Sequence, residues 1–126
     1  MEMRYIELKT GYNDNGPAWI GKVKLSKSGQ MIYFNDVAFQ KFHGTYSNYC
    51  NIETGDDYWI SNVKKDGTDR HWAGSGKILV GRDVLSEYLK ITGQETLNQT
   101  RYEVIDIEES YPVERIKRLK NGPAAG

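Results

Sequence analysis

Residues 18–42 read AWIGKVKLSKSGQMIYFNDVAFQKF, and this stretch of the 126-residue chain decides the fold. At its start, apolar residues alternate with lysines, which is the period of a β-strand with two different faces. The turn formers Ser28-Gly29 and Asn35-Asp36 then divide the stretch into three short runs rich in apolar residues. Connections this short join antiparallel neighbours, so the pattern predicts a three-stranded meander.

Further strands are expected on both sides of the meander. Arg4–Thr10 alternates, with Ile6 and Leu8 on one face and polar or aromatic residues on the other. Residues 12–17 predict a loop, and residues 43–57, which are polar and broken by two glycines, are interpreted as a loop that crosses the meander. Branched and aromatic residues predict three more strands, at Tyr58–Val63, Lys77–Val80 and Arg101–Ile107.

Two helices complete the expected fold. The pairs Val84/Tyr88 and Leu85/Leu89 are spaced four residues apart and predict a helix over Asp83–Thr92, which Gly93 ends. Pro112 suits the first turn of a second helix, whose face of lysines and arginines comprises Arg115, Lys117, Arg118 and Lys120. The expected fold is therefore α+β, a strongly bent antiparallel sheet or small open β-barrel of six or seven short strands with two helices.

We expect residues 1–120 to form a single α+β domain, because a chain of 126 residues has the usual length of one hydrophobic core, and residues 121–126 to fray as a C-terminal tail. Lysine and arginine together number 17, as do aspartate and glutamate, so the chain has no net field to attract nucleic acid. Nucleic-acid binding is therefore not favoured, although the basic face of the second helix offers a surface for phosphates or for an acidic partner.

The single cysteine, Cys50, cannot form an internal disulfide, which predicts a reducing compartment and a cytoplasmic location. The chain has no apolar run long enough to span a membrane, and its start lacks the pattern of a signal peptide. We therefore expect no membrane partner. Oligomeric state cannot be deduced from the sequence.

The candidate site is the segment Tyr58–Trp72, which reads YWISNVKKDGTDRHW. Asp66-Gly67 favours a type I′ turn that folds Thr68–Trp72 back against the preceding strand. Aromatic rings beside cations form a platform for a nucleobase, a sugar ring or a phosphorylated ligand, and cross-strand packing accounts for the same rings. The predicted ligand-binding residues are Trp59, Lys64, Lys65, Arg70, His71 and Trp72.

Catalysis would depend on His71 as a general acid or base. Asp69, two positions earlier, would orient its imidazole ring. No nucleophile with a local signature accompanies this pair. The histidines and the cysteine have no paired spacing for zinc, and Gly74-Ser75-Gly76-Lys77 lacks the spacing of a phosphate-binding loop. We therefore predict neither a metal nor a cofactor.

The candidate segment also resembles a motif of small uncharacterised bacterial proteins, Y-W-[IV]-S-G-x-K-K-[DN]-G-x-D-R. Tyr58-Trp59-Ile60-Ser61 and residues 64–70 carry the match, and Asn62 stands where the motif has glycine. The resemblance extends over residues 20–92. It implies a bacterial setting and directs attention to this segment, but it implies no activity.

Three hypotheses about function follow. The leading hypothesis is a small binding or interaction module for a protein or small ligand, with the Tyr58–Trp72 hairpin as its site. The alternative is a small hydrolase-like enzyme that uses His71 and Asp69. The third is a structural domain that self-associates through an exposed strand edge.

Overall fold

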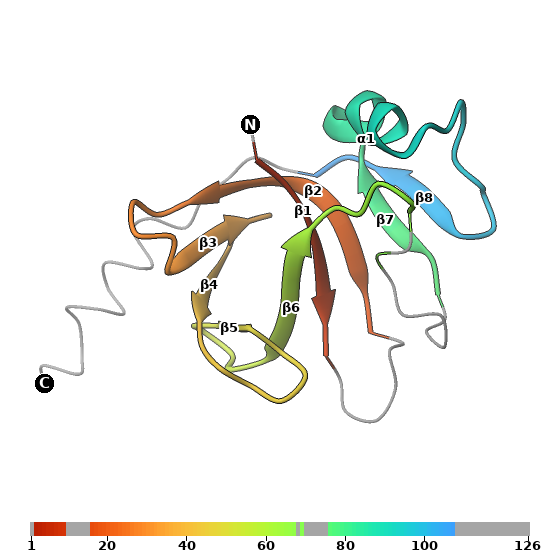
Figure 1. The fold of residues 1–126 in the computed structure, drawn as a ribbon. Helices are drawn as coiled ribbons and strands as arrows, with labels where there is room; N and C mark the ends of the chain where they lie inside the picture. The colour runs from red at the N-terminus through yellow and green to blue at the C-terminus, as the bar shows by residue number, and fades with distance from the viewer. Residues whose placement is uncertain (1, 10–15, 68, 70–75, 108–126) are drawn as a thin grey trace, which may run out of the picture.

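Figure 1 shows the computed structural model of the chain, which describes residues 2–9, 16–67, 69 and 76–107. The first six strands are β1 (Glu2–Leu8), β2 (Ala18–Leu25), β3 (Met31–Phe34), β4 (Val37–Lys41), β5 (Tyr49–Asn51) and β6 (Asp57–Asn62). The remaining elements are β7 (Ile78–Gly81), the 3₁₀ turn η1 (Arg82–Val84), the helix α1 (Leu85–Thr92) and β8 (Tyr102–Ile105).

The first six strands form a closed antiparallel barrel. Each strand pairs with the next along the chain, and β6 pairs back to β1 with Ile60 opposite Ile6. The predicted antiparallel barrel is thus confirmed, but it is closed rather than open. Closure satisfies the hydrogen-bonding groups along both edges of the barrel sheet, which an open sheet would expose.

Strand β2 changes its neighbour halfway along one edge. Residues 18–23 pair with β1, while the other edge pairs with β7 at residues 18–20 and with β3 at residues 24–25. Gly21 lies at the change, with the Phe34 ring directly against its backbone. A glycine is needed there because a Cβ atom would overlap the edge of that ring.

A β–α–β unit extends the sheet beyond the barrel. Strand β7 runs parallel to β2, β8 runs parallel to β7, and α1 makes the crossover between them (Figure 1). The predicted helix is confirmed, although its first turn is the 3₁₀ turn η1. It ends at Gly93, which has a left-handed backbone conformation at φ 70°. The Gly93 amide donates to the carbonyls of Leu89 and Lys90.

Two hydrophobic cores lie on opposite faces of β1. The inner core fills the barrel and consists of Ile6, Val23, Ile32, Phe34, Phe39, Tyr49 and Ile60. The outer core lies under α1 and consists of Tyr5, Ala18, Ile20, Ile78, Val80, Val84, Tyr88 and Tyr102. The alternation predicted for the first strand is confirmed, but both of its faces are covered.

The predicted meander over residues 18–42 is confirmed as β2, β3 and β4. Its second turn is of type I′, because Asn35 and Asp36 both have positive φ angles of 49° and 63°. The prediction of a loop over residues 43–57 is wrong in part. That segment contains β5, which is only three residues long and therefore carries no readable alternation.

The described residues contain eight strands rather than six or seven, and two of them, β7 and β8, pair in parallel. They contain one α-helix. The predicted second helix from Pro112 and the predicted tail at 121–126 lie outside the described residues, as does most of the predicted loop at 12–17.

We expect Gly21→Ala to destabilise the fold by about 1–3 kcal/mol, because the added methyl group overlaps the Phe34 ring in a packed core. Urea unfolding measures this change. Phe34→Leu provides the matched test, since a smaller side chain relieves the overlap. The loss caused by Gly21→Ala should be smaller in the Phe34→Leu background, and equal losses in both backgrounds would contradict the close approach.

Candidate functional site

The structure describes three of the six predicted ligand-binding residues. Trp59 lies on β6 with its ring on the outside of the barrel, 40% exposed, opposite Glu7 of β1. Lys64 and Lys65 follow the strand and are exposed. No hydrogen bond or ring contact joins Trp59 to either lysine. Arg70, His71 and Trp72 lie outside the described residues.

The turn after β6 differs from the predicted type I′ turn. The amide of Gly67 donates to the carbonyl of Lys64 at 3.2 Å, so Lys65 and Asp66 are the central residues of the turn. Gly67 has a φ of 74°, whereas Asp66 does not have a positive φ. The predicted Asp66-Gly67 turn type is therefore wrong, and the predicted second arm falls outside the described residues.

A type I′ turn needs positive φ at both central residues, and only Gly67 adopts it; Asp69 contacts the turn through its side chain. Its Oδ1 atom accepts a hydrogen bond from the backbone amide of Lys64 at 2.8 Å, so a side chain rather than a backbone carbonyl satisfies this donor. Its Oδ2 atom is buried and has no hydrogen-bond partner among the described residues. Burial raises the pKa of Asp69 above its ordinary value of 3.8, and the hydrogen bond from Lys64 offsets only part of that rise.

Two tyrosines attach this turn to the β–α–β unit. The Tyr102 hydroxyl donates to the carbonyl of Gly67 at 3.3 Å, and the Tyr88 hydroxyl lies 3.2 Å from that of Tyr102. Since Tyr102 uses its proton on Gly67, Tyr88 is the donor of the second bond. Burial and this hydrogen bond raise the pKa of Tyr88, so its hydroxyl keeps its proton at neutral pH.

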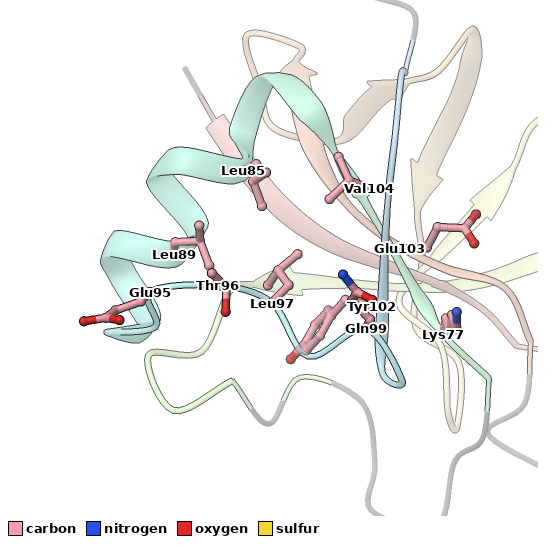
Figure 2. Close-up of a pocket in the computed structure, with 10 residues that line it drawn as sticks. All are labelled: Lys77, Leu85, Leu89, Glu95, Thr96, Leu97, Gln99, Tyr102, Glu103 and Val104. Carbon is pink, nitrogen blue, oxygen red and sulfur yellow. The ribbon is translucent and has the colours of Figure 1, made fainter.

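A groove with a volume of about 480 Å³ lies between α1, the following loop and β8. Its apolar lining comes from Leu85 and Leu89 on α1, Leu97 in the loop, and Tyr102 and Val104 on β8. Figure 2 shows Leu97 between the helix and the strand, with the Tyr102 ring beside it. The polar lining residues are Lys77, Glu95, Thr96, Gln99 and Glu103, with Glu95 at the opposite end of the view from Lys77.

The sequence interpretation missed this groove. Leu85 and Leu89 are expected on the apolar face of the helix, and residues 94–100 are the polar linker from that helix to the strand predicted at Arg101–Ile107. Leu97 is the only large apolar side chain in that linker. A lone leucine among polar residues is the one signal that would have indicated a contact across from the helix.

The α1–β8 groove and the 64–67 turn share Tyr102. Its ring lines the groove, whereas its hydroxyl holds the turn. The predicted candidate segment therefore contacts the groove through its turn. The arrangement suits binding, since apolar walls supply affinity and the few polar groups fix orientation.

Comparison of the chain with protein-family models, with curated proteins and with solved structures gave no match. Within the described ranges, no helix has both the length and the apolar character to cross a membrane. In the same part of the chain, no cluster of three or more histidine, cysteine, aspartate or glutamate side chains is arranged to hold a metal ion.

The raised pKa of Asp69 predicts a pH dependence of stability. The folded state holds the carboxyl proton more tightly than the unfolded chain, so the free energy of unfolding falls as the pH rises from 3.8 through the folded pKa. Asp69→Asn keeps an oxygen for the Lys64 amide and removes the titration. The stability of Asp69→Asn relative to wild type should therefore be greater at pH about 7 than at pH about 3.

Urea unfolding at the two pH values measures this difference. Asp57→Asn, which removes an exposed carboxylate from β6, controls for the change in net charge. If wild type and Asp69→Asn differ in free energy of unfolding by the same amount at both pH values, burial does not raise the pKa of Asp69.

Proposed function

We propose that this chain is a small binding module, without catalytic activity, that holds an amphiphilic small ligand in the α1–β8 groove. The observation that carries the proposal is the groove itself. Its volume of about 480 Å³ lies within the range of about 300–1,000 Å³ usual for small-molecule sites. Its apolar walls come from three separate segments of the β–α–β unit.

The lining defines the chemistry of the ligand. Leu85, Leu89, Leu97 and Val104 present aliphatic surface, which matches a linear or branched hydrocarbon chain. Gln99 and Lys77 supply hydrogen-bond donors beyond Leu97 (Figure 2). The proposed ligand therefore has an apolar chain and a head group that accepts hydrogen bonds.

The predicted hairpin residues enter the proposal through the turn. Tyr102 and Gln94 lie within 4 Å of a side chain added at Gly67, so the turn packs against the same unit that forms the groove. Lys64 and Lys65 extend from that turn and remain predicted ligand contacts, as do Trp59, Arg70, His71 and Trp72. The hydrolase-like alternative requires His71, and it remains a hypothesis beside self-association.

The proposed setting is the bacterial cytoplasm. The motif resemblance at residues 58–70 supports the bacterial origin. The single cysteine, Cys50, supports a reducing compartment.

A homologous series of linear carboxylates, from butanoate to decanoate, tests the groove. Each additional CH₂ buried against the leucines adds about 0.8 kcal/mol, so affinity should rise about fourfold per carbon until the groove is full. NMR titration should place the shifts on Leu85, Leu89, Leu97 and Val104. The corresponding alcohols distinguish a charged head group from a neutral acceptor.

Two substitutions on α1, each of a large aliphatic residue by alanine, form the matched pair. Leu89→Ala, in the groove, should weaken binding of the longest chain about tenfold, whereas Ile91→Ala, an exposed site on the same helix, should leave it unchanged. An affinity independent of chain length would overturn the proposal. A loss of affinity in the double variant Lys64→Ala/Lys65→Ala would bring the two turn lysines into the site.

A further inference from the structure

The end of the barrel at which β6 finishes is hollow. A pocket of about 290 Å³ opens there, and all six barrel strands contribute to its lining. We call it the barrel-mouth pocket. Leu25, Ile32 and Ile60 form its apolar part, and the polar side chains come from Arg4, Lys41 and Asn62.

The strand register aims the polar side chains at this opening. Alternate residues of a barrel strand point inward, and the inner core takes Ile6, Phe39 and Ile60. The next inward positions toward the mouth are two residues away on each strand. These positions hold Arg4 on β1, Lys41 on β4 and Asn62 on β6.

Two cations from different strands therefore line one pocket, and no carboxylate is among the lining residues that the structure describes. Lys41 forms no ion pair within the described part of the chain. Arg4 is paired with Glu2, whereas Lys41 is not, so a bound anion gains the attraction of the Lys41 charge and replaces Glu2 at Arg4.

Arg4 is paired with a carboxylate of the protein itself. Its Nη1 atom lies 2.9 Å from Oε2 of Glu2, whose side chain is 51% exposed, and it also donates to the carbonyl of Met3 at 3.1 Å. A partly exposed ion pair of this kind contributes little to stability, so a phosphate, with its larger charge, displaces Glu2 at small cost. The guanidinium has further donors to offer.

The Tyr49 side chain closes the pocket on another side. It is buried, and its hydroxyl lies 3.5 Å from the carbonyl of Gly29. Burial raises the pKa of Tyr49, and the nearby Arg4 charge lowers it by a smaller amount, so the phenol stays protonated and uncharged. The wall of the pocket therefore adds no negative charge.

The amide of Asn48 makes the adjoining wall rigid. Its Nδ2 donates to the carbonyl of Ile60 at 2.8 Å, and its Oδ1 accepts from the amide of Ile60 at 2.8 Å. This side chain thus pairs with β6 as a neighbouring strand would. A fixed wall reduces the entropy that a ligand must overcome on binding.

We propose that the barrel-mouth pocket binds a phosphate monoester of a ring-sized organic group. The phosphate carries a charge of about −1.5 to −2 at neutral pH, which matches the two cations Arg4 and Lys41, whereas a carboxylate matches only one. The organic group lies against Leu25, the partly exposed apolar residue of the lining, since Ile32 and Ile60 are buried beneath the pocket. This site is distinct from the α1–β8 groove and is independent of the proposed function.

Titration with phenyl phosphate, followed by calorimetry and NMR, tests the proposal. Binding should shift the amides of Arg4, Lys41 and Asn62 and should weaken with added salt. Inorganic phosphate should bind at least about threefold more weakly because it lacks the ring, and benzoate should bind more weakly because it carries a single charge. Equal binding of phenyl phosphate and benzoate, or no binding at millimolar concentration, would overturn the proposal.

Variants of the charged residues give opposite expected changes. Arg4→Gln and Lys41→Gln should each lower the affinity for phenyl phosphate about tenfold. Glu2→Gln removes the carboxylate that competes for Arg4 and should raise this affinity about threefold. A variant that misfolds does not gain affinity. An increase in affinity for Glu2→Gln would therefore still test the proposal if Arg4→Gln fails to fold. Lys90→Gln, on α1, is the control for net charge and should leave the affinity unchanged.

Decanoate binding by Arg4→Gln separates the two sites. It should match that of the wild type, since the groove contains none of the barrel-mouth residues. A phenyl phosphate response confined to Leu85, Leu89 and Leu97 would assign the anion to the groove and overturn the barrel-mouth site.

Discussion

Strand β1 is the element on which the rest of the structure depends, because both of its edges and both of its faces are occupied. Its edges pair with β2 and β6, and this double pairing closes the barrel. Its inward residue Ile6 belongs to the inner core, and its outward residue Tyr5 belongs to the outer core. Residues 5–7 of this strand are buried, so their polar groups must be satisfied locally, since water cannot reach them.

Glu7 shows how β1 meets this requirement. Its side chain is 2% exposed, and its two carboxylate oxygens are held by the Tyr5 hydroxyl and by the Lys9 ammonium, the latter at 2.8 Å. A buried carboxylate is tolerated when it is paired and hydrogen-bonded in this way. The alternation of β1 therefore separates two interiors of different polarity, where the sequence indicated a core face and a solvent face.

Local signals in the sequence were sufficient for much of the fold. Asn35 and Asp36 specify the turn between β3 and β4, because both adopt positive φ angles. Gly93 ends α1 because its backbone takes the left-handed conformation. Closure of the barrel and the parallel pairing of β2 with β7 join segments far apart in the chain, and no residue pattern encodes which strands meet. β5 was missed because its pairing with β4 and β6, rather than any alternation of its three residues, defines it.

The candidate site was predictable only in part for the same reason. The sequence indicated the 58–72 segment from its composition, and the structure describes an exposed Trp59 and two exposed lysines there. The predicted turn type failed at Asp66, which does not adopt a positive φ, and the Asp69 side chain takes the Lys64 amide. The α1–β8 groove depended on Leu97 meeting a helix that precedes it and a strand that follows it. The groove is a tertiary effect, which residue spacing alone does not reveal.

The divided edge of β2 also ties the two halves of the molecule into one cooperative unit. Residues 18–20 carry ladder bonds to β1 on one side and to β7 on the other, so the β–α–β unit cannot separate without exposing Ala18 and Ile20 to water. Partial opening of either half would thus remove support from the other. We expect the barrel and the helix to melt in a single transition, with coincident curves from tryptophan fluorescence and helical circular dichroism.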